Sequence, residues 1–435
     1  MPGAGDIITP FRGIRYHTAG SRDLSSRIAP PYDIIAPAMQ ADLYARDQHN
    51  FVRLELPQPS DRDDAEDDRY QRAAATLRDW LAQRVLIRDE RPALYLVQQA
   101  FQLRGRAWRR RGVFALVRLP EANERYVLSH EGTLAAPKAD RLHLMRACHA
   151  MTSPILMMSE DGRGELLSLL EQTAGEAEAV AANGDGVAHR LWPLHDAGLV
   201  EAICAAVGAG PLFIADGHHR FETAVTCRDE MRQRLPQASA QAGFNYALAL
   251  VTSAQDEGVK ILPTHRVLSG LGEAGLGEIR ARIAEAFDVR QVAVPKGDEL
   301  PALTWPDGGA ARGHVYGAYW GDGHYYVLTA RGETAPAGTS SVASLDVSVL
   351  HRRLIDPVLS KLGKVVGLAY VTDEQQALEA VARGDCDLAL FLRSTRVSEV
   401  LAVARAGERM PGKSTYFYPK APAGLVLSDA SAEPI

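Results

Sequence analysis

Residues 211–220 read Pro-Leu-Phe-Ile-Ala-Asp-Gly-His-His-Arg, and this stretch decides the fold that we expect for the chain. Residues 211–215 form an apolar run that is typical of a buried strand. Gly217 follows, and residues 221–235 have the periodicity of a helix. A glycine at such a junction lets the backbone turn tightly and approach a ligand closely. The pattern therefore predicts a strand, a glycine turn and a helix in direct succession.

The polar residues at this turn carry groups that bind anions. His218 and His219 fall in the first helical turn, where backbone N–H groups and the macrodipole favour negative charge. Arg220 can fork onto two phosphate oxygens, and Asp216 can hold a divalent cation or polarise a histidine. One alternative is that these residues only cap a helix. Another is a transition-metal site, although adjacent histidines rarely point both rings at one ion. We favour a polyphosphate or oxyanion site, which is not a Walker loop because the sequence contains no GxxxxGK[ST].

Alternating and periodic segments on both sides of this stretch predict strands and helices in mixed order. The expected strands are 51–56, 93–103, 112–119, 125–130, 188–192, 246–252, a hairpin over 313–330 and 388–392. The expected helices are 70–84, segments within 139–180 with a break near 152–154, 278–287, 345–361, 374–383 and 396–406. The fold class is thus α+β with mixed sheets. We expect three regions, at 1–125, 126–270 and 271–435, with a glycine-rich turn at 270–277 and, within the third region, a polar connection at 331–341.

Composition restricts the class of protein. Hydrophobic residues make up 46% of the 435 residues and charged residues 23%, which are ordinary values for a soluble globular protein. The net charge of −6 argues against nucleic-acid binding, which needs a basic face. We interpret the densest basic run, residues 104–111, as a solvated hairpin turn. The four cysteines are far apart and no signal or membrane-spanning segment is recognised, so we expect reduced thiols in a cytoplasmic protein.

Three further motifs could carry chemistry. Residues 129–133, Ser-His-Glu-Gly-Thr, place Glu131 beside a histidine as a candidate general base, and the nearby Lys138 and Arg141 could neutralise phosphate; an ordinary ion pair is the alternative. Residues 413–420 either clamp an anion with two lysines or form an edge strand. Residues 264–266, Thr-His-Arg, either contribute a catalytic histidine or contain a partly buried structural one.

These motifs together are similar to those of a known family. The shared markers are Pro10-Phe11-Arg12-Gly13, Ala29-Pro30-Pro31-Tyr32-Asp33, His49-Asn50 with Arg53-Leu54, His130-Glu131 with Thr133, Lys138 with Asp140-Arg141, Ala215–Arg220, Pro263–Arg266 and Lys413–Lys420. On these markers, which extend over nearly the whole chain, the protein resembles the domain-of-unknown-function family DUF1015. Several motifs in one order are more specific than any single one.

The Asp216–Arg220 motif is also similar to the signature of the ParB/sulfiredoxin superfamily, and within it to that of the free serine kinases. This resemblance implies a ParB/sulfiredoxin-like core whose glycine turn and helix hold nucleotide phosphates, with ATP or ADP as the donor and Mg²⁺ as a cofactor. In the free serine kinases a glutamate from another segment is the base for the substrate hydroxyl, and Glu131 is the candidate here. The chain differs from them in its greater length, its separate N-terminal motifs and its C-terminal Lys-Ser-Thr element.

We therefore predict a nucleotide-dependent phosphotransferase that acts on a small hydroxylated metabolite, with serine as the leading candidate. A phosphatase acting on a compound such as phosphoserine, or a non-catalytic ParB-like nucleotide-binding or nucleic-acid-associated protein, is the alternative. A homodimer is compatible with the sequence. The residues assigned to catalysis are Glu131, His130, Asp216 and His219; to phosphate binding, Gly217, His218, Arg220, Lys138, Arg141, Lys413, Ser414 and Thr415; to substrate binding, Tyr32, Asp33, Thr264, His265 and Arg266; and to the metal, Asp216.

Overall fold

The computed structural model describes residues 7–60, 63, 68–172, 175–295, 313–332, 341–362 and 366–435. The chain forms two compact units. Unit 1 comprises residues 1–129, 133–260 and 419–435, and unit 2 comprises residues 130–132 and 261–418. Both units combine helices and strands in mixed sheets, so the predicted α+β class is confirmed. No helix in the described part of the chain is long and apolar enough to cross a membrane.

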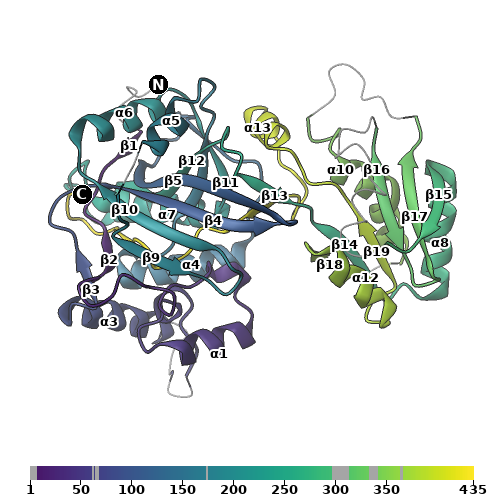
Figure 1. Cartoon of the computed structure of the whole chain (residues 1–435), viewed down its shortest axis with the longest axis horizontal. Helices are drawn as coiled ribbons and strands as arrows, with labels where there is room; N and C mark the ends of the chain where they lie inside the picture. Colours follow the sequence, from purple (N-terminus) through teal and green to yellow (C-terminus); the bar gives the residue numbers. More distant parts are fainter. Residues whose placement is uncertain are drawn as a thin grey trace. The chain divides into compact units, whose positions relative to one another are not determined.

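The core of unit 1 is a mixed sheet with the strand order β6-β11-β8-β12-β5-β4-β10-β9, and β1 pairs with β5 (Figure 1). Its strands are β1 (Ile8–Thr9), β4 (Leu94–Leu103), β5 (Arg106–Arg118), β6 (Val127–Leu128), β8 (Ile155–Ser159), β9 (Ala179–Ala182), β10 (Ala188–Leu194), β11 (Leu212–Asp216) and β12 (Tyr246–Ser253). The short strands β2 (Ile14–Tyr16), β3 (Leu86–Arg88), β7 (Ala150–Met151) and β21 (Ser428–Asp429) form pairs outside this sheet. Strand β8 is buried along its whole length and lies between β11 and β12, because every residue but its last is apolar.

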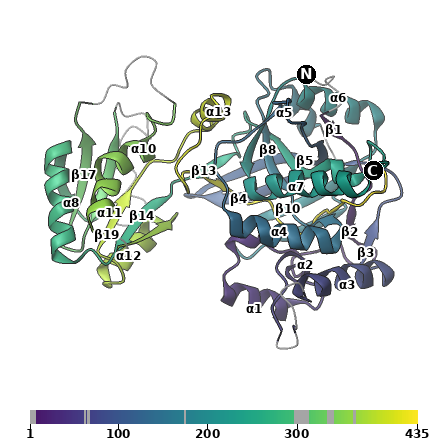
Figure 2. The ribbon, with the colours of Figure 1, turned by 180° about the vertical axis from the view of Figure 1, so that it is seen from behind.

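Helices cover this sheet, and α4 and α7 lie side by side on one face of it (Figure 2). The helices of unit 1 are α1 (Pro37–Arg46), α2 (Val52–Glu55), α3 (Asp68–Ala82), α4 (Ala135–Cys148), α5 (Glu165–Glu171), α6 (Ala197–Gly208) and α7 (His218–Arg234), with short 3-10 turns at Tyr32–Ile34 and Gly243–Asn245. Strand β11 lies second from one edge of the sheet, next to β6, and runs directly into α7.

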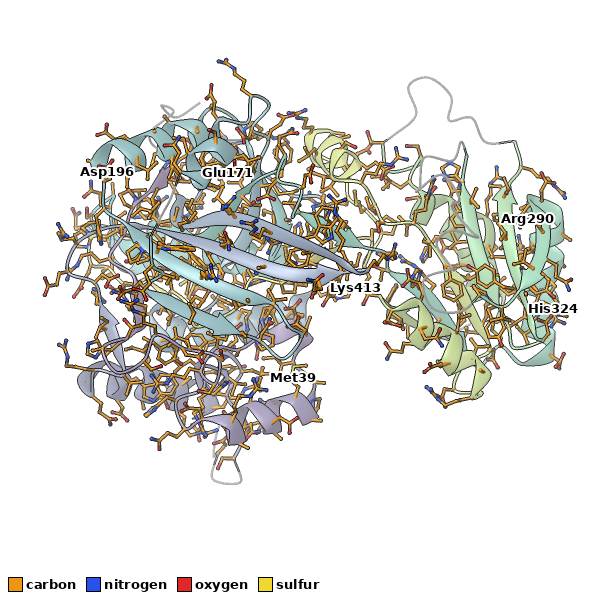
Figure 3. The ribbon with its side chains drawn as sticks, viewed as in Figure 1. Met39, Glu171, Asp196, Arg290, His324 and Lys413 are labelled. Carbon is orange, nitrogen blue, oxygen red and sulfur yellow. The ribbon has the colours of Figure 1, made fainter. Side chains whose placement is uncertain are left out.

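Unit 2 contains a second mixed α/β arrangement around a sheet with the order β15-β17-β16-β19-β14-β18. Its elements are β14 (His265–Ser269), α8 (Gly272–Ala286), β15 (Phe287–Ala293), β16 (Val315–Tyr319), β17 (His324–Ala330), α10 (Asp346–Leu350), a π-helical turn (His351–Ile355), α11 (Asp356–Leu362), β18 (Gly367–Val371), α12 (Glu374–Ala382), β19 (Leu388–Phe391), α13 (Val397–Arg405) and β20 (Tyr416–Tyr418). Strand β13 (Lys260–Leu262), at the start of this unit, pairs with β20. Arg290 and His324 mark the paired strands β15 and β17 in Figure 3.

The structure corrects several expected elements. Residues 51–56 form a helical turn instead of a strand, since Asn50 Oδ1 accepts a hydrogen bond from the Val52 amide and starts the turn. The segment 155–159 is a central strand where a helical pattern was expected, because continuous apolar runs suit either structure. Helix α8 begins at Gly272, within the expected glycine-rich turn. Most of the expected polar connection at 331–341 lies outside the described residues.

Candidate functional site

The junction of β11 and α7 has the predicted strand, glycine turn and helix. Gly217 has a φ of +97°, in the left-handed region, and α7 begins at the next residue. A Cβ atom at Gly217 would lie 3.0 Å from Nε of Arg220, so both the backbone conformation and the close packing favour glycine. Because α7 is 17 residues long, its aligned peptide dipoles place partial positive charge at this turn.

Asp216 lies between two cations at the start of this turn. Its Oδ2 accepts a hydrogen bond from Arg220 Nη2 at 2.7 Å, and its Oδ1 contacts the ammonium group of Lys420. Burial alone would raise the pKa of Asp216, but the attraction of Lys420 and Arg220 outweighs burial and holds the pKa well below its usual range. The cluster of Asp216, Arg220 and Lys420 therefore carries a net charge of about +1 at neutral pH. We call it the ion cluster.

Arg220 is directed into the protein. Its side chain is 6% exposed, and Nη1 donates to the carbonyl oxygen of Pro154. The guanidinium group that the sequence predicts to fork onto phosphate is thus held beneath the glycine turn by Asp216 and a backbone carbonyl. This arrangement suits a residue that positions Asp216 and supplies positive charge to the turn.

A buried polar row leads to Lys420 from β4 and β5 of the same sheet. Arg110 in β5 is 1% exposed and donates from Nε to Gln99 Oε1 at 3.0 Å and from Nη2 to the Pro419 carbonyl at 2.6 Å. Gln99 Nε2 in turn donates to the Lys420 carbonyl at 3.1 Å. These bonds fix the segment that carries Lys420.

The prediction of a solvated hairpin turn over residues 104–111 holds only for the tip of the hairpin and is wrong for the residues that follow it. The chain turns at Arg104 and Gly105, which both have positive φ, and β5 begins at Arg106. Burial lowers the pKa of Arg110 to about 10, although Asp256 and Asp216 oppose this effect. Within the described residues, Nη1 of Arg110 has no hydrogen-bond partner.

The Pro-Pro-Tyr-Asp motif lies in the same unit and contacts neighbouring charged groups. The guanidinium carbon of Arg141 lies 4.0 Å from the ring centroid of Tyr32. Burial raises the pKa of Tyr32 to about 12, and Arg220 and Arg141 act in the opposite direction. Asp33 is exposed and contributes to the electrostatic stabilisation of Arg220. Tyr32, Asp33, Arg141 and Arg220 therefore belong to one charged region.

Glu55 is a buried carboxylate in this region that the sequence did not indicate. It is 0% exposed, and its two oxygens accept from Thr152 Oγ1 at 2.7 Å and from Ser153 Oγ at 2.8 Å. Arg141 Nη1 lies 3.8 Å from Glu55 Oε1. Thr152, Ser153, Arg141 and Arg220 are among the residues that line a cavity of about 20 Å³, which is the space of a single water molecule. The strand predicted over 51–56 gave no indication that Glu55 is buried, because such a strand gives no reason to bury a carboxylate.

The start of α4 is joined to α7 by polar contacts. Glu222 Oε2 accepts from Lys138 Nζ at 2.9 Å and from Thr133 Oγ1 at 2.6 Å. The amide of Leu134 donates to His219 Nε2 at 2.9 Å, so the neutral ring of His219 carries its proton on Nδ1. Arg141 forms the ion pair with Asp140 that the alternative interpretation proposed, with 2.8 Å between Nε and Oδ2, whereas Lys138 pairs with Glu222.

Unit 2 brings the remaining predicted residues together. His130 is 1% exposed, and its Nε2 lies 3.2 Å from Thr415 Oγ1. Glu131 forms an isolated β-bridge with Met410, and the carbonyl of His130 accepts from the Met410 amide at 2.8 Å. The His-Glu motif and the Lys-Ser-Thr motif are therefore neighbours.

The Thr-His-Arg motif is buried in the same unit. His265 is 0% exposed, its Nδ1 accepts from the Leu392 amide at 3.3 Å, and its ring centroid lies 5.1 Å from that of Phe391. This environment matches the structural interpretation of the histidine. Arg266 donates from Nη2 to the carbonyl of Lys413 at 3.3 Å and so links this motif to the Lys-Ser-Thr segment.

The sequence motifs and a direct match to a family model agree on the family. The model of the family described as "Protein of unknown function (DUF1015)" matches residues 8–348. The chain belongs to the DUF1015 family. The match includes the ion cluster's Asp216 and Arg220, the His-Glu motif and the Thr-His-Arg motif, whereas Lys420 lies beyond it.

Three different proteins are among the solved structures that are similar to this DUF1015 protein. A conserved hypothetical protein from Pyrococcus furiosus is 15% identical with a TM-score of 0.35, covering 73% of this chain and 95% of that chain. A free serine kinase in complex with AMP is 15% identical with a TM-score of 0.36, covering 72% and 91%. SbnI from Staphylococcus aureus, with a C-terminal truncation, is 11% identical with a TM-score of 0.36, covering 73% and 88%. No curated protein matches the sequence.

The residues of this DUF1015 protein do not fit the predicted Mg²⁺ site. Both oxygens of Asp216 contact cationic side chains, so the carboxylate is already neutralised. No group of three or more His, Cys, Asp or Glu side chains in the described part of the chain could hold a metal ion. His218 and His219 therefore gain no third ligand there either. Arg220 and Lys420 of the ion cluster place positive charge beside the turn.

Proposed function

We propose that this protein is a phosphotransferase that binds the phosphates of ATP or ADP at the Gly217 turn and phosphorylates a small hydroxylated metabolite. The observation that carries the proposal is the ion cluster at the N-terminus of α7. Arg220 and Lys420 both contact the single carboxylate of Asp216, so the cluster itself carries excess positive charge where the helix dipole is also positive.

This arrangement suits phosphoryl transfer for a physical reason. The reaction asks a protein to position its reactants and to stabilise negative charge on phosphate oxygens, more than to form covalent bonds. Buried cations held by fixed hydrogen bonds act in a region of low dielectric, and they need little reorganisation when charge develops. Arg110 and Gln99 hold the segment of Lys420 in this way, because they bond to the carbonyls of Pro419 and Lys420.

The other assignments follow from the sequence motifs. Gly217 would allow close approach of the phosphates, and the amides of His218 and His219 would face them at the first turn of α7. Tyr32 and Asp33 are the proposed contacts to the metabolite from the charged region of unit 1. Serine is the leading acceptor because the Asp216–Arg220 motif resembles that of the free serine kinases, and Glu131 is the proposed base for its hydroxyl group.

The test is incubation of the full chain with ATP or ADP, Mg²⁺ and a panel of hydroxylated metabolites, followed by mass spectrometry for the gain of one phosphate. We expect phosphorylated serine or a similar product from the wild type and a large loss with Lys420→Met. Lys361→Met is the matched control, because this lysine also pairs with a carboxylate, Glu278, but is not among the residues assigned to the site. A product formed equally by all three proteins would refute the role of the ion cluster. Nucleotide binding without any product would favour a non-catalytic nucleotide-binding protein.

A further inference from the structure

Unit 2 contains a buried arginine whose charge is not balanced by a carboxylate in the described part of the chain. Arg266 in β14 is 1% exposed. Burial lowers its pKa to about 10, and Tyr370 is the one group of the described residues that acts electrostatically in the opposite direction. The ring centroid of Tyr370 lies 5.1 Å from the guanidinium carbon. A buried charge without a partner is costly, so this position calls for an anion.

The hydrogen bonds of Arg266 leave part of its guanidinium group available. Nε donates to His351 Nε2 at 3.3 Å, Nη1 donates to the Thr264 carbonyl, and Nη2 donates to the carbonyl of Lys413, a residue labelled in Figure 3, at 3.3 Å. A guanidinium group has five N–H donors, and these three bonds to neutral acceptors use three of them. The remaining two, one on each terminal nitrogen, suit the two oxygens of a carboxylate or phosphate group.

A small polar cavity adjoins this guanidinium group. Its volume is about 10 Å³, which is enough for a single oxygen atom, and Thr264, Arg266, Arg393, Thr395 and Ser414 are among its lining residues. Thr264 is 7% exposed, and its Oγ1 has no hydrogen-bond partner in the described part of the chain. A buried hydroxyl without a partner is unfavourable unless a ligand completes it.

Two carboxylates, Asp346 and Glu399, also line this cavity, and both are already engaged. Glu399 Oε2 accepts from the Arg396 amide at 2.7 Å. Asp346 accepts from Arg393 through two bonds of 2.7 and 3.0 Å, and its Oδ1 lies 2.6 Å from His314 Nδ1. It is therefore held by these groups and does not neutralise Arg266. The position next to Arg266 and Thr264 thus combines positive charge, two N–H donors and a hydroxyl group.

We propose that unit 2 binds a small oxyanion, the carboxylate or phosphate group of a metabolite, at Arg266 and Thr264. One oxygen occupies the cavity and accepts from Thr264 Oγ1, and the guanidinium group donates to the anion through its two remaining N–H groups. The site is separate from the ion cluster and does not depend on phosphoryl transfer.

Hydrogen exchange of the full chain, followed by mass spectrometry, tests this site without relying on activity. The probes are inorganic phosphate and acetate, each compared with chloride at equal ionic strength. We expect one or both probes to slow exchange in peptides that cover 261–269, in a saturable manner. Protection by phosphate alone identifies a phosphate site and protection by acetate identifies a carboxylate site. The absence of protection by both probes would overturn the proposal.

Two variants separate binding from folding. Thr264→Val removes the unpartnered hydroxyl at nearly constant shape, so the fold should persist while the affinity for the protecting anion falls about tenfold or more. Ser348→Ala is the matched control, because Ser348 is also buried with an unpartnered Oγ among the described residues but does not line the cavity. Equal affinity in these two variants would contradict the site. Arg266→Lys keeps the charge but loses the planar fork, and it should weaken binding at least as much as Thr264→Val.

Discussion

Replacement of Lys420 by methionine should destabilise the region around β11 by an amount that depends on pH. Lys420 is 10% and Asp216 16% exposed at the side chain, so solvent screens their attraction only partly. Removal of one partner from a buried ion pair costs about 3–5 kcal/mol. Arg220 remains bonded to Asp216 in the variant, so we expect the lower end of this range, about 3 kcal/mol, at pH 7.

The direction of the pH effect follows from the lowered pKa of Asp216. A carboxyl whose pKa is lower in the folded state than in the unfolded chain contributes stability above its unfolded pKa of about 3.9, and this contribution is lost as the pH falls toward the folded value. The unfolded carboxyl titrates alike in wild type and Lys420→Met, so the difference between them should be full at pH 7 and should shrink at low pH only to the extent that loss of Lys420 raises the pKa of Asp216 in the folded variant.

Urea unfolding at both pH values measures this difference, with hydrogen exchange of residues 212–216 as the local readout. The control is Lys361→Met, whose ammonium group pairs with Glu278 and is 63% exposed, so its loss should cost less than about 1 kcal/mol. A Lys420→Met cost below about 1 kcal/mol at pH 7, or one that grows at pH 3, would refute the reasoning about the ion cluster.

Three further changes have defined outcomes. Gly217→Ala should cost about 1–3 kcal/mol in chemical denaturation because of its positive φ and the close approach of Arg220, and a neutral result would show that the turn is not constrained. Glu131→Gln should remove phosphoryl transfer in the mass-spectrometric assay while nucleotide affinity in calorimetry stays unchanged; wild-type turnover would exclude Glu131 as the base. The thiol of Cys148 should react slowly with Ellman's reagent at pH 8, because burial raises its pKa to about 12 and leaves a thiolate fraction of roughly 10⁻⁴, whereas reaction at the rate of a free thiol would contradict this burial.

The sequence predicted best where local chemistry and local structure agree. The turn at Gly217 combines an apolar strand, a residue that permits positive φ and a segment with helical periodicity, and the structure has all three features in the predicted place. Helix α3 and the hairpin of β16 and β17 were likewise recognised from periodicity and turn residues.

Long-range partners explain what the sequence did not show. Glu55 is buried because Thr152 and Ser153, almost a hundred residues away along the chain, donate to its carboxylate. Lys420 contacts Asp216 from the end of the chain, and no local pattern relates the two residues. Unit 1 also combines residues 1–129 and 133–260 with residues 419–435, and only tertiary packing brings these segments together.

Arg110 is an intermediate case, because the strand period could have revealed it. Counting back from the buried Phe114 in steps of two places Arg110 on the same face of β5, opposite Gln99 on β4. The surrounding arginines favoured a solvated turn instead, since a buried arginine is rare without a partner.

Hydrogen exchange of the wild-type chain with saturating ADP tests the central claim most directly. If nucleotide phosphates bind at the Gly217 turn, peptides that cover residues 212–225 should exchange more slowly with ADP, and Lys420→Met should weaken this protection. Binding of ADP, established by calorimetry, with no change of exchange in these peptides would contradict the claim.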